Sequence, residues 1–527
     1  MHDTKGRLAT SRTAMVTSPH HLASEAGRDV LAAGGSAIDA AIAIGATLAV
    51  VYPHFCGLGG DAIWIVSDET GKADTLSGIG QAAANISNIP APIPLRGPMS
   101  AITSACVVDS WGTAHDFART RWGGGPSFAS LLEPAIALAE EGFPLSASQA
   151  FWLDFRRSEM GTWAGFSALY DTSHLKTESD LVRLPQLAAS LRMIARDGYR
   201  SFYEGELAAK IAEGLQAAGS PLSAADLAAT RTRVEPPLRL GYRGLDLLAP
   251  PPPTQGVSTL EIMALLDRIG IAEAAADNAD YYHLVVEAIK QAFLSRTDIA
   301  DPDFSPLDVG AWLAPERLAD KAARIDRQAA LPWPHRFKTG DTVFFAAVDA
   351  HGRSASVLQS IYFDWGSGVV AGDTGILWQN RGAAFSRDPA SPNRLRPGAR
   401  PFYTLNPGMT LKDGRPHLLY GTQGADGQPQ TLATLLSRVI DHGFDPAAAL
   451  AAPRFLLGRT FSDSRDSLKI EESVGEEVLN KLAQRGHEIS LLEPHSPISG
   501  QAGLIRVENG IIEGAHDPRS DGVALGL

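Results

Sequence analysis

Residues 341–349 read Asp341-Thr342-Val343-Phe344-Phe345-Ala346-Ala347-Val348-Asp349, an apolar run rich in aromatic and β-branched side chains. Such a run predicts a buried strand. The turn signal Asp349-Ala350-His351-Gly352 follows it, and residues 354–360 form a second run of the same kind. Together they predict a hairpin that places Ser360 on the strand beside Thr342.

Thr342 becomes a complete catalytic unit if the chain is cut between Asp341 and Thr342. Its hydroxyl is then the nucleophile, and its freed α-amine, with an ordinary pKa of roughly 7.7–8.0, can accept the hydroxyl proton. The preceding residues 331–335 are expected to form an exposed irregular connector. A strand-initial Thr is by itself ordinary, because Thr is common in strands. The assignment therefore depends on the rest of the chain.

Motifs along most of the chain resemble the γ-glutamyltransferase family of N-terminal-nucleophile hydrolases. They are residues 14–27, 34–41 and 51–54, then Gly57, Gly59, Gly60 and Asp61, and downstream residues 366–370, 375–377, Asn380, 400–401, 406–407, 452–455, 486–487 and 517–522. Each match is weak alone, but their order and spacing together are specific.

This resemblance implies an α+β fold, the αββα sandwich of N-terminal-nucleophile hydrolases, in which two stacked antiparallel sheets lie between helical layers. It also implies two cleavage products, a large subunit of residues 1–341 and a small subunit of residues 342–527. The two would form one intertwined heterodimeric unit, which could dimerise further.

The family's catalytic residues can be carried over one by one. Thr342 matches the nucleophile, and the Asp341–Thr342 bond matches the cleavage site. Ser360 falls where the family has a second hydroxyl that helps position the nucleophile and assists processing, although a strand Ser bonded locally would look the same. Gly424 and Ala425 fall in the oxyanion turn, whose backbone N–H groups face the acyl oxygen. Two departures are Val343 and Ala425, which stand where Thr and Gly are usual.

The positions that bind the α-carboxylate and α-ammonium of a glutamyl substrate in the family depart further from the family pattern. No cation occurs in residues 78–82, where the family has an Arg for the α-carboxylate, and Ala383 and Ala384 replace the Asp pair that holds the α-ammonium. The predicted substrate-binding residues are instead Arg381, Asn380, Tyr362, Tyr403 and Thr404. Arg381 would pair with a carboxylate in a fork geometry, whereas a solvated or structural ion pair is the alternative for this residue.

A small amide that carries a carboxylate is therefore the expected substrate. The resemblance to the family, and to its members that act on such small amides, implies more specifically the cleavage of oxamate to oxalate and ammonia in purine catabolism. Two alternatives remain open. One is a γ-glutamyl transferase or hydrolase, or an acylase for glutaryl or cephalosporin-type substrates. The other is an uncleaved precursor that serves as a scaffold, against which the retained Thr342, Ser360 and oxyanion turn argue.

Composition excludes several other classes. The formal charge of −13 is spread without basic or acidic blocks, which disfavours nucleic acid or an anionic membrane as partner. No run approaches the roughly 20 apolar residues of a membrane span. Residues 1–8 lack the apolar core of a signal peptide, so a cytoplasmic protein is expected.

No cofactor is expected. Cys56 and Cys106 are the only cysteines, too few for a disulfide framework and without metal-ligand spacing, and Cys56 is predicted to be a small core residue. His54 and His487 lie in turns that resemble those of the family, and no paired-His spacing occurs. Helices are expected at residues 37–48, 186–195 and 281–294, and the Pro-rich residues 249–254 should form a rigid extended loop.

Overall fold

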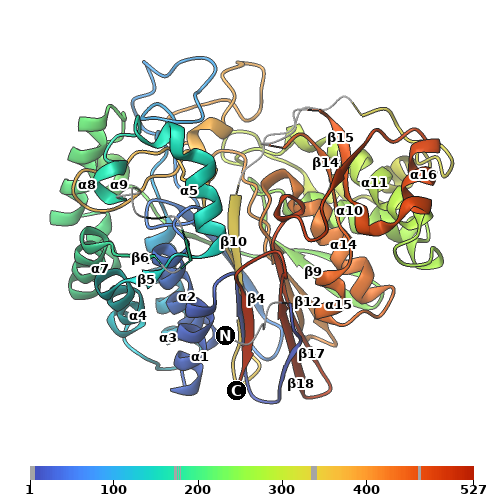
Figure 1. Ribbon diagram of the computed structural model, residues 1–527, viewed down its shortest axis with the longest axis horizontal. Coiled ribbons are helices and arrows are strands. Elements are labelled where there is room, and N and C mark those ends of the chain that lie inside the picture. The colour runs from blue at the N-terminus through green and yellow to red at the C-terminus, as the bar shows by residue number, and fades with distance from the viewer. Residues whose placement is uncertain (1–5, 171–174, 176, 179, 334–340, 461–464) are drawn as a thin grey trace.

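The computed structural model describes residues 6–170, 175, 177–178, 180–333, 341–460 and 465–527. Two seven-stranded sheets stack face to face between two layers of helices (Figure 1). Within the described residues the neighbouring strands of both sheets are antiparallel, as in the central pairs β10–β11 and β13–β17. The αββα sandwich predicted from the sequence is therefore confirmed.

Each sheet interleaves strands from both sides of Asp341. One sheet has the order β19 (Val523–Gly526), β2 (Met15–Ser18), β10 (Asp341–Val348), β11 (Ser354–Tyr362), β3 (Asp61–Ser67), β4 (Ala73–Gly78), β7 (Arg233–Glu235). The other has the order β1 (Ala9–Ser11), β18 (Ile511–His516), β17 (Ala502–Glu508), β13 (Arg415–Thr422), β12 (Gly408–Lys412), β9 (Leu245–Ala249), β8 (Leu238–Tyr242). A cut before Thr342 would thus leave both products inside one core.

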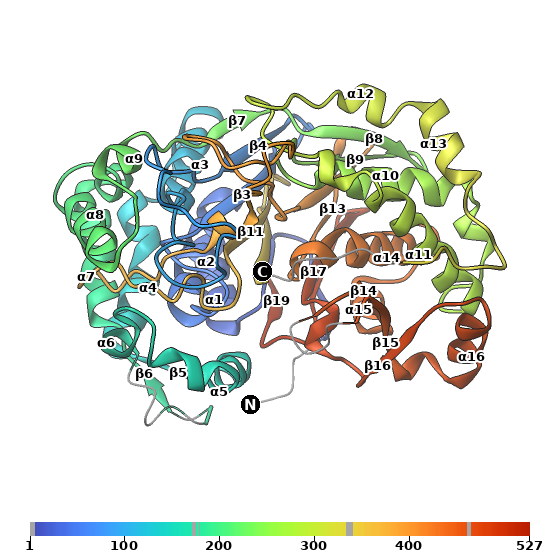
Figure 2. The same ribbon diagram turned by 90° about the horizontal axis from the view of Figure 1, so that it is seen from above.

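The helical layers flank the two sheets on opposite sides (Figure 2). Against the first sheet lie α1 (His21–Ala32), α2 (Ala37–Val51) and α3 (Val107–Arg121), with α4 (Phe128–Glu141), α5 (Ala147–Met160), α6 (Phe166–Leu169), α7 (Pro185–Asp197), α8 (Glu206–Ala218) and α9 (Ala224–Ala228) on the same side. Against the second lie α10 (Gly256–Arg268), α14 (Gln428–Ile440) and α15 (Pro446–Ala451), with α11 (Ala279–Phe293), α12 (Val309–Trp312), α13 (Pro315–Ala322) and α16 (Glu476–Gln484) beyond them. The minor sheets comprise β5 (Phe143–Pro144) with β6 (Leu181–Val182), and β14 (Phe455–Gly458), β15 (Ser467–Glu471) and β16 (Ile489–Leu492).

Strand β10 is buried on both faces. Val343, Phe345 and Ala347 join the core beneath the first helical layer. The alternate residues Phe344, Ala346 and Val348 join the core between the two sheets. Because successive strand side chains point to opposite faces, a slip of one residue would exchange the two cores, so the register of β10 is strongly fixed.

The predicted helices are confirmed, with ends shifted by up to three residues. The helix expected at residues 37–48 is α2, which begins at an Ser36 N-cap whose side chain forms a capping box with Asp39. The helices expected at residues 186–195 and 281–294 are α7 and α11. The Pro-rich loop at residues 249–254 has no helix, and Pro252, Pro253 and Thr254 are buried. No helix of the described residues is long and apolar enough to cross a membrane.

The predicted connector before Asp341 is seen only in part. Residues 331–333 have no regular secondary structure, and Pro332 is exposed while Leu331 and Trp333 are partly buried. Pro334 and His335 lie outside the described residues.

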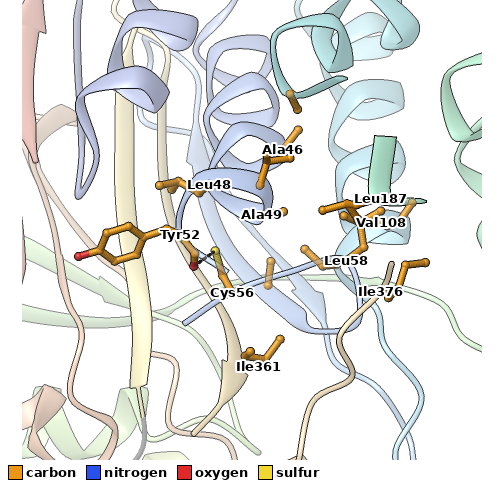
Figure 3. Close-up of a cluster of buried hydrophobic side chains, with 14 of the residues drawn as sticks. Ala46, Leu48, Ala49, Tyr52, Cys56, Leu58, Val108, Leu187, Ile361 and Ile376 are labelled. Carbon is orange, nitrogen blue, oxygen red and sulfur yellow. Dashed lines mark hydrogen bonds between the residues drawn. The ribbon is translucent and has the colours of Figure 1, made fainter. Parts of the chain in front are cut away.

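Cys56 is a core residue, as its apolar surroundings predict. It packs among Leu48, Leu58 and Ile361, and its Sγ donates a 3.6 Å hydrogen bond to the Tyr52 carbonyl (Figure 3). Burial raises the pKa of the Cys56 thiol, so the reactive thiolate is disfavoured.

Candidate active site

Thr342 lies at the start of β10, where the pairing with β11 changes register. Asp341 pairs with Tyr362, but Val343 pairs with Gln359, so the ladder is irregular at Thr342. Such irregularities re-aim a side chain beside an active site. Thr342 is 1% exposed. The predicted hairpin is present, and it brings the predicted nucleophile next to β11.

Ser360 contacts the peptide bond that would be cut. Its hydroxyl donates a 2.7 Å hydrogen bond to the Asp341 carbonyl oxygen and accepts a 2.7 Å hydrogen bond from the Tyr362 N–H. Negative charge develops on that carbonyl oxygen when a hydroxyl attacks the carbon. The Ser360 hydroxyl is therefore placed to stabilise the oxyanion of self-cleavage.

The turn predicted to form the oxyanion hole connects β13 to α14. Gly424 and Ala425 have φ values of +119° and +41°. Glycine adopts such a backbone conformation without strain because it has no Cβ, whereas Ala425 is strained. Within the described part of the chain their N–H groups have no hydrogen-bond acceptor. Gln428, which follows the turn, has its Nε2 3.5 Å from Thr342 Oγ. The turn and the nucleophile are thus neighbours, with two N–H donors available.

Arg381 is completely buried between two tyrosines. Its guanidinium carbon lies 4.0 Å from the centre of the Tyr362 ring and 3.9 Å from that of Tyr403. Nη1 donates a 3.2 Å hydrogen bond to Thr404 Oγ1, but Nε and Nη2 have no partner among the described residues. These last two form the edge with which Arg156 and Arg519 hold carboxylates elsewhere in this chain. Arg381 thus presents a free bidentate edge, and one of the two rings that cover it belongs to Tyr362, the strand partner of Asp341.

The other predicted binding residues adjoin the group formed by Arg381, Tyr362 and Tyr403, which we call the cage. The Tyr403 hydroxyl donates a 2.7 Å hydrogen bond to Asp61. The Thr404 carbonyl accepts a 2.7 Å hydrogen bond from Gln255, whose Nε2 also reaches the Ala425 carbonyl. Asn380 is occupied by the backbone, because it accepts from the Phe363 N–H and donates to the Leu95 carbonyl. Its predicted contact with substrate stays a prediction, and its observed contacts are those of a residue that secures a turn.

A cavity lies beside Asp341. It has a volume of about 290 Å³, and the residues that line it include Asp341, Gly424, Phe55, Phe151 and Trp152. The Asp341 carboxylate accepts a hydrogen bond from Gln423. Burial, followed by the negative charge of Asp364, raises the pKa of Asp341 to about 8. A cavity with both polar and apolar lining residues therefore lies beside the scissile bond.

Sequence reasoning missed three residues that shape the site. Gln255 ties the cage to the oxyanion turn, Gln428 reaches the nucleophile, and Asp61 holds Tyr403. In the sequence Asp61 stands out only as part of a glycine-rich turn. No local pattern marks a Gln whose side chain bonds to residues far away in the sequence. A signal did exist for Asp61, since a carboxylate directly after Gly59-Gly60 opens a buried strand where an acid is uncommon.

One group of potential metal ligands occurs in the described part of the chain: His283, Glu287 and His487. The two imidazoles bond to each other at 2.8 Å, and Glu287 pairs with Lys290 at 2.7 Å. Glu287 also accepts from the Leu331 N–H and so ties the start of the connector to α11. A cation beside the carboxylate disfavours a metal there, and the group is remote in sequence from the predicted site.

Comparison with known proteins identifies the relatives of this chain. The sequence profile described as Gamma-glutamyltranspeptidase matches residues 23–527. An oxamate amidohydrolase proenzyme from Klebsiella pneumoniae is 43% identical over 97% of this chain and 98% of its own length. A glutathione hydrolase-like proenzyme, YwrD, from Bacillus subtilis is 39% identical over 97% of this chain and 98% of its own length.

A similar solved structure is the cephalosporin acylase from Bacillus halodurans. It superposes with a TM-score of 0.89 at 30% sequence identity and covers 99% of this chain and 97% of its own. The similarity therefore extends over both sheets and both helical layers.

We expect the purified protein to cleave itself between Asp341 and Thr342. Gel electrophoresis and mass spectrometry should show fragments of residues 1–341 and 342–527, because the nucleophile needs its α-amine freed. Thr342→Ser should still be cleaved, since it keeps the hydroxyl, whereas Thr342→Ala should remain one chain. Cleavage of Thr342→Ala at this bond would refute the assignment.

Ser360→Ala should slow self-cleavage by about 10²–10³-fold, the usual effect of losing one oxyanion donor. The measurement is the time course of fragment appearance in freshly refolded or newly translated protein. Ser356→Ala is a matched control, because Ser356 lies on the same strand and bonds to the Gly408 carbonyl instead. Equal cleavage rates for the two variants would show that the bond from Ser360 to Asp341 is only structural.

Proposed function

Because this chain belongs to the Gamma-glutamyltranspeptidase family, we propose that it is a self-processing amidohydrolase that cleaves a small amide bearing a carboxylate, with oxamate as the substrate and oxalate and ammonia as products. The observation that carries this proposal is the buried Arg381, whose Nε and Nη2 face no partner in the described part of the structure. A buried guanidinium without an anion is costly, and a planar carboxylate is the ligand that matches its free edge.

Self-cleavage would produce the mature enzyme. The Thr342 hydroxyl attacks the Asp341 carbonyl carbon and the peptide nitrogen leaves as the α-amine of Thr342, so that an ester replaces the amide. Water then hydrolyses the ester and releases the carboxylate of Asp341. The products are the proposed subunits 1–341 and 342–527, held together by the sheets that they share.

The same groups would then hydrolyse the substrate. The Thr342 hydroxyl attacks the amide carbon while its own α-amine accepts the proton, and the N–H groups of Gly424 and Ala425 stabilise the oxyanion. Ammonia leaves with that proton, and water hydrolyses the acyl ester to regenerate Thr342. Arg381, held by Tyr362, Tyr403 and Thr404, would orient the carboxylate next to the reacting carbon.

A second candidate is an acylase for a substrate with a large amine. The cavity of about 290 Å³ beside Asp341 favours it, because ammonia needs no such space. The name of the Bacillus halodurans relative, cephalosporin acylase, is of this kind. The same cavity also adjoins the point where the precursor's connector reaches Asp341.

Arg381→Ala should lower kcat/KM for oxamate by roughly 30- to 1000-fold, the effect of losing one charge-assisted bidentate contact of about 2–4 kcal/mol. Oxamide is the matched control substrate, since it has the same shape without the charge, and its hydrolysis should change little. Arg381→Lys should recover only part of the loss, because an ammonium cannot match both oxygens. Unchanged oxamate kinetics in processed Arg381→Ala would refute the role of this residue.

The two candidate functions differ in which amides are cleaved. Processed wild-type enzyme should release ammonia from oxamate much faster than it releases aniline from glutaryl or γ-glutamyl anilides. The positions Ala383 and Ala384 offer no partner for the α-ammonium of a γ-glutamyl group. A glutaryl group has no ammonium, but its carboxylate lies farther from the amide carbon than the carboxylate of oxamate, which Arg381 is proposed to hold next to that carbon. Ammonia and aniline release, measured at equal substrate concentrations, checks this. Faster turnover of a glutaryl anilide would favour the acylase.

A further inference from the structure

Asp61 lies beside the scissile bond although it is far from it in sequence. It opens β3 and pairs with Ser360 of β11, which in turn neighbours the start of β10. Gly59 and Gly60 allow this approach, because a Cβ on either would lie 2.3 Å from a backbone oxygen, that of Leu377 or that of Ser360. The glycine-rich turn thus brings the Asp61 carboxylate close to Ser360 in the candidate active site.

Every oxygen of the Asp61 carboxylate is held by a donor. Oδ1 accepts hydrogen bonds from the Gly80 N–H at 3.0 Å and the Cys106 N–H at 2.7 Å. Oδ2 accepts from the Tyr403 hydroxyl at 2.7 Å. The side chain is completely buried. Asp61 is therefore fixed, and through Tyr403 it fixes the ring that covers one face of Arg381.

Arg381 has no ion-pair partner among the carboxylates of the described residues. The Asp61 carboxylate is linked to it through one intervening group, the Tyr403 phenol, whose ring stacks on the guanidinium and whose hydroxyl bonds to Asp61. Burial raises the pKa of Asp61 to about 6, while Tyr403, the Cys106 N–H and the charge of Arg381 act in the opposite direction. The other titratable groups facing Asp61 are the buried Cys106 thiol and the Tyr403 phenol, and burial raises the pKa of both, so neither ionises near neutral pH.

We propose that Asp61 is the counter-charge and positioning residue of Arg381, and that it takes up a proton from solvent when a carboxylate binds to Arg381. The inference rests on the proposed role of Arg381. In the free enzyme the positive charge of Arg381 favours the ionised Asp61. A bound carboxylate offsets that charge and adds a second anion, so the protonated acid becomes the favoured form. In protonated Asp61, Oδ1 would still accept from the Gly80 and Cys106 N–H groups. The added proton on Oδ2 would be donated to the Tyr403 oxygen, which reverses the direction of that hydrogen bond.

This coupling sets the direction of the pH dependence. The complex binds more protons than the free enzyme, so affinity for the anion is greatest below the pKa of Asp61 in the free enzyme and weakens as pH rises through it. The change is about tenfold for each pH unit between the free and the bound pKa values. Titration of the Thr342 α-amine, at roughly pH 7.7–8.0, acts on every variant alike.

The test is calorimetric binding of oxalate to processed enzyme between pH 5 and pH 8, in pairs of buffers with different ionisation enthalpies. Wild type should take up protons on binding, and its Kd should rise with pH more steeply than that of Asp61→Asn. The asparagine keeps a partner for Tyr403 but carries no charge, so this variant should bind more tightly than wild type at pH 7 and above. Asp39→Asn is the matched control, because Asp39 is a buried carboxylate bonded to Ser36 near the far, hairpin end of β10.

Tyr403→Phe provides a second measurement if Asp61→Asn does not fold. Loss of the hydroxyl removes a bond that favours ionised Asp61, so the midpoint of the pH dependence should move upward while ring stacking on Arg381 remains. Equal pH profiles and equal proton uptake in wild type and Asp61→Asn, or an unmoved midpoint in Tyr403→Phe, would overturn the inference. Oxalate binding that is insensitive to Arg381→Ala would instead overturn the proposed function itself.

Discussion

The hydrogen bond from the Ser360 hydroxyl to the Asp341 carbonyl is the contact on which the site depends. It joins the strand that carries Thr342, the predicted nucleophile, to the strand beside it, at the one peptide bond whose cleavage would create the proposed catalytic amine. The pairing is held in place by burial, because β10 and β11 are buried along their whole length. A fixed register is required here, since a displacement of one residue would move both hydroxyls to the wrong faces.

A second constraint is the placement of a cation inside the protein without a direct ion-pair partner among the described residues, since the nearest linked carboxylate, Asp61, bonds to the Tyr403 hydroxyl and not to Arg381. Two tyrosine rings against Arg381 supply cation–π attraction, but they cannot satisfy the Nε and Nη2 donors. Nε and Nη2 of Arg381 are thus unpaired in the described part of the chain, and the proposed carboxylate ligand would pair with them. Selectivity for an anion would then follow, because an uncharged amide of the same size would leave the same donors unpaired.

The sequence alone was sufficient for the αββα fold, the β10–β11 hairpin, the helix α2, and the proximity of Ser360 to the Asp341–Thr342 bond. All of these follow from local periodicity, turn residues or family motifs. Arg381 with Tyr362, Tyr403 and Thr404 was predicted as a set, but the stacking of the guanidinium between the rings was not. Asp61, Gln255 and Gln428 could not be assigned roles, because each acts on a residue more than 80 positions away, across sheet pairings that no local pattern encodes.

Backbone strain is found where these contacts converge. Tyr362 and Ala425 have φ values of +82° and +41°, a region that costs residues with a Cβ about 1–2 kcal/mol each. Tyr362 follows Ser360 by two positions and covers one face of Arg381, while Ala425 supplies a predicted oxyanion donor and its carbonyl is held by Gln255. Strain of this kind persists only where surrounding contacts outweigh it. Because Tyr362 contacts Arg381 and Ala425 belongs to the proposed oxyanion turn, the fold gives up stability locally at two residues that hold the groups proposed to bind the carboxylate and the oxyanion.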